Sequence, residues 1–233
     1  MLESPAAREE FQPVSRCLLA LYYHSMVPRL YLALLTVAVT AAAQSAVEIE
    51  NDWVRVLRVK QGPHEKVAEQ PHPDAVAVYL TDIHQRRNGL EATHKAGDVA
   101  WLDAGKHSEE NLSDQPLEYV LVELKPGAPK AKGWPVALDP VKLDPVHHQV
   151  PIENARVRVL RTILEPHLKG PTHEHPSYVV VYVTELHTTM TLADGKQVDN
   201  PRHPGEVAWR DPYRHTTENV GDRTAIEIQV ELK

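Results

Sequence analysis

Cysteine, phenylalanine and basic residues are scarce in this sequence of 233 residues, which has one Cys, one Phe and a formal net charge of −7. A single cysteine excludes a disulfide framework and a cysteine-rich zinc module, because both need several thiols. The acidic total argues against binding to nucleic acid or to an anionic membrane, since both need concentrated Lys and Arg. The sequence also lacks the GxGxxG, P-loop and GxSxG patterns, which disfavours a nucleotide site and a serine hydrolase.

Histidine and proline are abundant, with 14 and 19 residues respectively. The prolines favour short elements joined by many turns, and the histidines are the main candidates for chemistry. The hydrophobic fraction of 42% is ordinary for a globular protein, and the length suits one large domain or two small ones.

An apolar run near the N-terminus predicts an export signal. Leu30–Ala43 follows Arg29 and ends in small residues. It is shorter than the ~20 residues that a membrane-spanning helix needs, and it matches the hydrophobic region of a secretory signal peptide. Ala41 and Ala43 suit the −3 and −1 positions of a cleavage site at Ala43/Gln44. We therefore expect a periplasmic or secreted protein with no stable membrane anchor after cleavage.

Residues 1–43 are accordingly assigned to a leader and signal peptide. The first 25 residues are unusual for such a signal because they contain acidic side chains, and Met26 is an alternative start. An uncleaved anchor, extended by Leu18–Tyr23, is the alternative interpretation.

The rest of the chain contains an internal duplication. Residues 50–84 align with residues 153–187 at an offset of 103, with 17 identities in 35 positions. Residues 97–125 align with residues 205–233 at an offset of 108, with 13 identities in 29. The change of offset places five extra residues in the second copy, in a connection near 190–203. Two domains of the same fold are therefore predicted.

Both copies have the pattern of an all-β fold. Short runs rich in Val, Leu and Tyr are bounded by Pro, Gly, Asp and Asn, which is typical of strands, and no long amphipathic helix is evident. We predict tandem β-barrels at 47–125 and 147–233. The Pro-rich segment 126–146 is predicted to be an extended surface linker. Asp194-Gly195 is predicted to form the turn of a hairpin in the second copy.

Three histidines of the second copy form a candidate metal site. His173 and His175 are two residues apart before a strand-like run, so both side chains point to the same face of a strand. His215, forty residues later, supplies a third imidazole from a neighbouring strand. Three such nitrogens suit Fe, Mn, Zn, Ni or Cu and leave coordination positions open.

These motifs resemble those of the cupin superfamily, and the duplication resembles a two-domain bicupin. Gly170, His173 and His175 are similar to the start of the first cupin motif, while Gly205, His215 and Asn219 are similar to the second. The resemblance covers nearly all of residues 47–233. It implies two jelly-roll barrels and a metal bound by His173, His175 and His215.

Two departures from the cupin pattern matter. The glutamate of the first motif would fall at Val179 or Val180, neither of which can bind a metal. In the first copy the matching positions are Gln70, His72 and His107, and two imidazoles with an amide make a poor metal site. We therefore interpret the first barrel as degenerate, with these three residues as a possible second site.

Other residues were assigned from their positions. Glu174, between the two motif histidines, is expected to face out of the barrel. His147 and His148 are expected to be solvated at the exit of the linker. Aromatic and guanidinium groups near the motifs could orient a small molecule, and the candidates are Tyr178, Tyr182, Tyr213 and Arg214.

Three functions remain open from the sequence. The first is a metal-dependent enzyme acting on a small organic molecule, of the dioxygenase, isomerase or decarboxylase type that the resemblance implies. The second is a non-catalytic periplasmic module that binds a metal or a small ligand. The third is a structural protein whose histidines are incidental. No catalytic residue is assigned, the expected partner is a small molecule, and the expected state is a monomer or homodimer.

Overall fold

The computed structural model describes residues 44–233. The predicted leader and signal peptide at 1–43 lie outside the described residues. Within residues 44–233 no helix has the length and apolar character needed to cross a membrane.

The N-terminal half consists of strands joined by short turns. In chain order they are β1 (Gln44–Glu50), β2 (Val54–Gln61), β3 (Lys66–His72), β4 (Ala75–Tyr79), β5 (Ile83–Arg87), β6 (Leu90–His94), β7 (Val99–Leu102), β8 (Gly105–Asn111) and β9 (Leu117–Leu124).

The C-terminal half follows a one-turn helix, α1 (Pro140–Leu143). Its strands are β10 (His148–Glu153), β11 (Val157–Leu164), β12 (His173–His175), β13 (Tyr178–Tyr182), β14 (Leu186–Leu192), β15 (Gln197–Arg202), β16 (Val207–Arg210), β17 (Tyr213–Asn219) and β18 (Ala225–Leu232).

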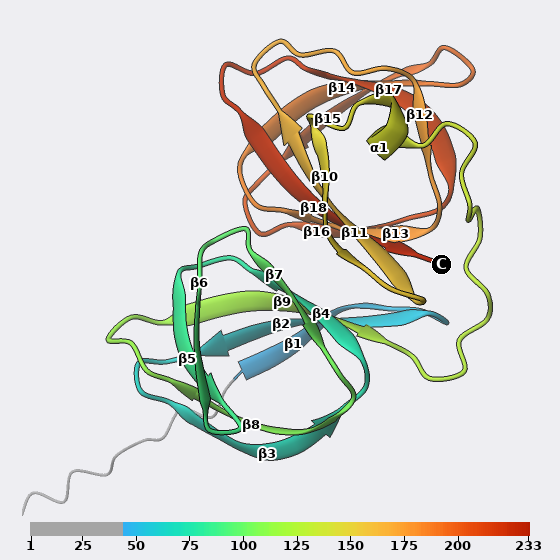
Figure 1. Cartoon of the computed structure of the whole chain (residues 1–233). Helices are drawn as coiled ribbons and strands as arrows, with labels where there is room; N and C mark the ends of the chain where they lie inside the picture. The colour runs from blue at the N-terminus through green and yellow to red at the C-terminus, as the bar shows by residue number, and fades with distance from the viewer. Residues whose placement is uncertain (1–43) are drawn as a thin grey trace, which may run out of the picture. The chain divides into compact units, whose positions relative to one another are not determined.

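Each half folds into two antiparallel sheets that close into a barrel (Figure 1). The N-terminal sheets have the orders β1-β2-β9-β4-β7 and β3-β8-β5-β6, and the C-terminal sheets have the orders β10-β11-β18-β13-β16 and β12-β17-β14-β15. The two pairs of orders are the same once each strand is matched to its repeat. This arrangement confirms the predicted all-β fold of tandem jelly-roll barrels.

The extra residues of the second copy lengthen one hairpin. Strands β14 and β15 pair as far as Thr191↔Gln197, and the turn between them contains Gly195 at φ +81°. Only glycine adopts such a positive φ without a steric cost. The predicted turn at Asp194-Gly195 is therefore confirmed.

Neighbouring residues of a strand point to opposite faces of the sheet and therefore pack in two different apolar clusters. In β13, Tyr178, Val180 and Tyr182 belong to an apolar cluster within the C-terminal barrel, whereas Val179 and Val181 belong to a larger cluster. That larger cluster also contains Val76 and Val78 of β4, from the N-terminal half. Both faces of these strands are thus buried, which explains their continuous apolar sequence.

The linker contains one helical turn within its otherwise extended course. Asp139 caps α1, since its side chain accepts a hydrogen bond of 3.1 Å from the Val141 amide, and Pro140 opens the helix, where its missing N–H is not needed. Helix α1 lies against β10 and β12 (Figure 1). The linker therefore borders the strand that carries His173 and His175.

Candidate metal site

Strand pairing brings the three predicted histidines together. Strand β12 runs antiparallel to β17, with His173 opposite His215 and His175 opposite Tyr213. All three imidazoles are buried, and one nitrogen from each lies within 4.8 Å of the others. The spacing predicted from the sequence therefore produces one convergent cluster.

Hydrogen bonds fix the orientation of these rings. The Nδ1 atom of His173 lies 2.9 Å from the Pro171 carbonyl oxygen, and Nδ1 of His215 lies 3.3 Å from the Thr217 hydroxyl. Nδ1 of His175 donates to Glu231 Oε1 at 2.8 Å. In the tautomer in which Nδ1 donates in these contacts, Nε2 of the neutral imidazole carries the free lone pair that a metal needs.

Two of these Nε2 atoms have no protein partner. Nε2 of His175 and Nε2 of His215 are buried and lack a hydrogen-bond partner among residues 44–233. An unsatisfied buried nitrogen costs free energy, and native proteins rarely leave one without a reason. A transition metal bound by the three histidines would satisfy both atoms, so the donor set fits such an ion.

The surroundings favour the neutral form of His173 and His215. Burial is the main cause that lowers the pKa of His173 to about 3, and the neighbouring His175 adds to the effect. Burial is also the main cause that lowers the pKa of His215 to about 2, with His173 and His175 adding to the effect. Because a metal competes with protons for these nitrogens, low pKa values favour metal binding.

These shifts predict an acid-sensitive metal-free protein. The folded state keeps His173 and His215 neutral, whereas the unfolded chain binds protons below its ordinary pKa of about 6.5. Their contribution to stability is complete above about pH 6.5 and decreases below it by about 1.4 kcal/mol per pH unit for each histidine. Urea unfolding in EDTA between about pH 7 and about pH 5 measures this slope. The His215→Asn variant should have a shallower slope, and an unchanged slope would contradict the assignment.

A buried ionic network supports His175 and was missed in the sequence analysis. The Glu231 carboxylate is fully buried and accepts hydrogen bonds from His175 Nδ1 at 2.8 Å and from Arg158 Nε at 2.6 Å. Arg158 also donates to both oxygens of Asp139 in the linker. The only sequence clue was that Glu231 and Arg158 recur as Glu123 and Arg55 in the first copy. Such partners fix the tautomer and ring orientation of a metal-ligating histidine.

The structure agrees with the absence of a motif glutamate from the site and with the outward direction expected for Glu174. Val180, where a motif glutamate could fall, is buried in the apolar interior of the C-terminal barrel. Glu174 faces away from the histidines and accepts hydrogen bonds from Arg214 Nε at 2.8 Å and from the Ala137 amide at 3.0 Å. No carboxylate therefore joins the three-histidine cluster among the described residues.

The proposed pocket residues divide between two faces. Tyr178 and Tyr213 lie near His175 with their hydroxyls 2.8 Å apart, and Tyr182 is buried in the same barrel. Arg214 does not belong with them, because strand alternation turns its half-exposed side chain towards Glu174 on the outer face. Two other guanidinium groups lie beside Tyr182: Nη2 of Arg210 lies 3.4 Å from its hydroxyl, and Arg202 lies over its ring, 5.6 Å from the centroid.

The expectation that His148 is solvated was wrong. Its side chain is buried, its ring centroid lies 5.3 Å from that of His173, and burial lowers its pKa. The reason is that α1 folds the linker onto the barrel, where Nδ1 of His148 lies 3.1 Å from the Asp144 carbonyl oxygen. His148, His173 and His215 line a cavity of only about 20 Å³. That volume is about enough for one water molecule.

The matching residues of the first barrel do not form such a cluster. Gln70 lies opposite His107 in the ladder between β3 and β8, and the rings of His72 and His107 stack with centroids 4.1 Å apart. Nδ1 of His72 lies 2.7 Å from the Pro73 carbonyl oxygen, and Nε2 of His107 lies 3.2 Å from that of Asp103. Gln70 is exposed. Within residues 44–233, the three-histidine cluster of the C-terminal barrel is the one group with metal-ligand spacing.

No protein-family model matches the sequence, and no curated protein is similar to it in sequence. Solved structures are similar in fold. AerE from Microcystis aeruginosa aligns with a TM-score of 0.63 and 11% identity over 84% of this chain and 95% of its own. A cupin 2 conserved barrel domain protein from Leptotrichia buccalis aligns with a TM-score of 0.54 and 9% identity over 83% and 90%.

A third solved structure is that of an enzyme. Salicylate 1,2-dioxygenase from Pseudaminobacter salicylatoxidans aligns with a TM-score of 0.56 and 12% identity over 84% of this chain and 78% of its own. At such low identity the likeness is one of fold. The chain has the cupin fold, present twice in tandem, and its three-histidine cluster fits a metal-binding cupin.

Proposed function

We propose that the C-terminal barrel holds one divalent transition metal through His173, His175 and His215. The observation that carries this proposal is the pair of buried Nε2 atoms, in His175 and His215, that have no partner in residues 44–233. Neutral imidazoles favour a borderline transition metal, from the set Fe, Mn, Zn, Ni and Cu, over Mg²⁺ or Ca²⁺, which prefer oxygen ligands.

The leading function is metal-dependent chemistry on a small organic molecule. A metal with open positions polarises carbonyl or enolate oxygens, and iron additionally supports dioxygen chemistry. The fold likeness to a salicylate dioxygenase supports a reaction of that type. Around the cluster, the hydroxyl pair of Tyr178 and Tyr213 and the guanidinium of Arg210 are the groups that could orient a polar substrate.

One observation favours the alternative, a non-catalytic metal-binding module. The cavity beside the histidines holds about 20 Å³, far less than an organic substrate needs. The linker is tied next to it, since Asp139 accepts two hydrogen bonds from Arg158 and Glu174 accepts one from the Leu138 amide. Asp144 and His147, which follow α1, also line this cavity, so the linker contributes to its small size.

Elemental analysis of the purified protein tests the metal proposal first. We expect about one equivalent of a transition metal per chain. The metal found then selects the assays, which are oxygen consumption with phenolic acids for iron, and isomerase or decarboxylase assays for zinc, nickel or manganese. Metal bound without turnover would favour the non-catalytic module. No metal after purification and reconstitution would contradict both.

We also propose that the chain is exported and cleaved at Ala43/Gln44. The apolar run at 30–43 supports this, because it matches the hydrophobic region of a secretory signal peptide and ends in small residues. Expression in a Gram-negative host followed by N-terminal sequencing of the periplasmic protein should find Gln44 first. A protein retained in the membrane with residues 30–43 attached would support the uncleaved anchor instead.

A further inference from the structure

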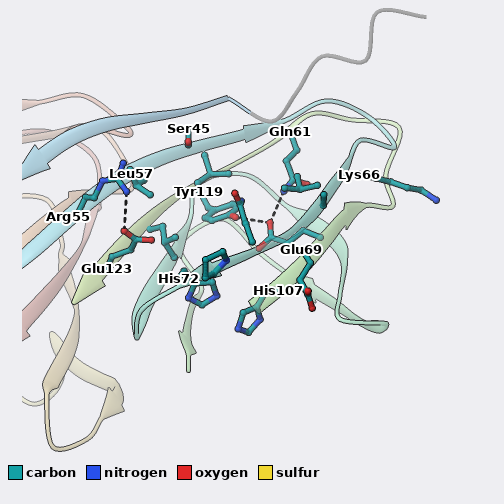
Figure 2. Close-up of a pocket in the computed structure, with 17 residues that line it drawn as sticks. Ser45, Arg55, Leu57, Gln61, Lys66, Glu69, His72, His107, Tyr119 and Glu123 are labelled. Carbon is teal, nitrogen blue, oxygen red and sulfur yellow. Dashed lines mark hydrogen bonds and ion pairs between the residues drawn. The ribbon is translucent and has the colours of Figure 1, made fainter. Parts of the chain in front are cut away.

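A large cavity lies in the N-terminal barrel, away from the three-histidine cluster. It has a volume of about 590 Å³, compared with about 20 Å³ beside the histidines of the C-terminal barrel. Figure 2 shows Glu123 with Leu57 and Arg55 at one end, and Gln61 with Tyr119 further along. A volume of this size falls within the range of about 300–1,000 Å³ that small-molecule sites occupy.

The cavity contains a buried carboxylate whose partners have been lost. Glu123 corresponds to Glu231, and its side chain is only 10% exposed. In the C-terminal barrel the equivalent carboxylate binds both His175 and Arg158 within hydrogen-bonding distance. The nearest cation to Glu123 in the described residues is Arg55, with Nη1 3.8 Å from Oε2, which is too far for a hydrogen bond.

The counterparts of both partners are present in the first copy, but neither makes a hydrogen bond to Glu123. His72, the counterpart of His175, points its Nδ1 to the Pro73 carbonyl oxygen at 2.7 Å. Arg55, the counterpart of Arg158, is 45% exposed and also lies 4.0 Å from Glu50. Burial raises the pKa of Glu123, and the charges of Arg55 and His72 offset this effect only in part.

The rest of the wall is amphipathic and rich in acceptors. Gln61 Oε1 is buried without a hydrogen-bond partner in residues 44–233, while its Nε2 donates to Glu109 at 2.7 Å. Apolar surface comes from Leu57, Val59 and Leu121 on the inward faces of β2 and β9. Gln61 Oε1 and the Glu123 carboxylate are acceptors to which no group in the described residues donates, and they lie beside an apolar wall. A ligand that carries N–H groups on an apolar body would match both features.

We propose that the N-terminal barrel is a binding site for a small organic cation, with a primary ammonium group held by Glu123 and an apolar body against Leu57 and Leu121. The cavity is lined by three carboxylates, Glu123, Glu109 and Glu69, and by two cations, Arg55 and Lys66, so the excess of negative charge favours a cation over a carboxylate ligand. His72 and His107 have no metal-ligand geometry, but the first barrel keeps a cavity in which Glu123 has no hydrogen-bonded partner among residues 44–233, so we interpret it as a barrel that binds a different ligand. This site is separate from the proposed metal centre.

The test uses three probes of matched size, 2-phenylethylamine, 2-phenylethanol and 3-phenylpropanoate, titrated by NMR against the full chain in EDTA. We expect the amine to bind more tightly than the alcohol and the carboxylate. Glu123→Gln should weaken amine binding at least about tenfold, the loss expected for one charge-assisted hydrogen bond. Glu91→Gln, which changes an exposed carboxylate of the same barrel that does not line the cavity, should leave amine binding unchanged.

A second variant distinguishes a loss of amine binding from a folding defect caused by Glu123→Gln. Ala68 lies on the exposed strand β3 at the cavity wall, so Ala68→Trp adds an indole to the cavity without disturbing the buried core. It should also abolish amine binding. Equal binding of the three probes, or amine binding unchanged in both Glu123→Gln and Ala68→Trp, would overturn the proposal. Because EDTA is present, neither result depends on the metal site.

Discussion

Replacing His215 with alanine should reduce the metal content from about one equivalent per chain to near zero. His215 is the ligand contributed by β17, whereas His173 and His175 both come from β12, so its loss leaves two nitrogens from one strand. Two imidazoles hold a divalent metal far more weakly than three convergent ones. His173→Ala should have the same effect. The measurement is elemental analysis of the proteins after identical purification.

The duplication supplies matched controls for this experiment. His107 occupies the position equivalent to His215, and His72 the position equivalent to His175. His107→Ala and His72→Ala should leave the metal content unchanged, because neither residue belongs to a three-ligand cluster. Equal metal loss in the variants of both barrels would contradict the assignment of the site to the C-terminal barrel.

The second large effect is expected at Glu231. Its carboxylate is fully buried between His175 and Arg158, and the Arg158 side chain is only 5% exposed. Glu231→Gln keeps the shape but removes the charge, which leaves a buried guanidinium compensated by Asp139 alone. Breaking a buried ion pair from one side costs about 3–5 kcal/mol, and we expect a loss of that size in the free energy of unfolding. Urea unfolding of the metal-free protein measures it.

Glu123→Gln is the matched control, and it should behave differently. The Glu123 carboxylate is buried without a hydrogen-bonded partner, so a neutral amide should change the free energy of unfolding by less than about 1 kcal/mol. The Glu231→Gln variant should also bind its metal about 10–100-fold more weakly, because His175 loses the acceptor that orients it. If the two variants are equally stable, the network around Glu231 does not support the fold.

Local pattern was sufficient to predict the fold and the three histidines. Strand periodicity and the internal duplication predict two equal barrels, and the structure has the same sheet order in both. The spacing of His173 and His175 places both on one face of a strand through the twofold alternation of side chains. These features depend on neighbouring residues, which is why they can be read along the chain.

The direction of a side chain was harder to predict, because a shift of one position along a strand reverses the face to which the side chain points. Arg214 follows Tyr213 and precedes His215, and all three are close to the motif in sequence. Alternation turns Arg214 outward to Glu174 while Tyr213 and His215 point into the barrel. Arg210, four residues earlier, supplies a guanidinium beside Tyr182 instead.

The sequence by itself determined the all-β class, the two barrels and the residues that form the three-histidine cluster, because short-range periodicity encodes strands and their faces. Only the tertiary structure decided that His148 is buried against His173 and that Glu231 and Arg158 support His175. It also decided that the large cavity lies in the barrel without the cluster. Each of these depends on contacts between segments far apart in the chain, such as the 73 residues that separate Arg158 from Glu231. No local pattern in the residues records such a contact.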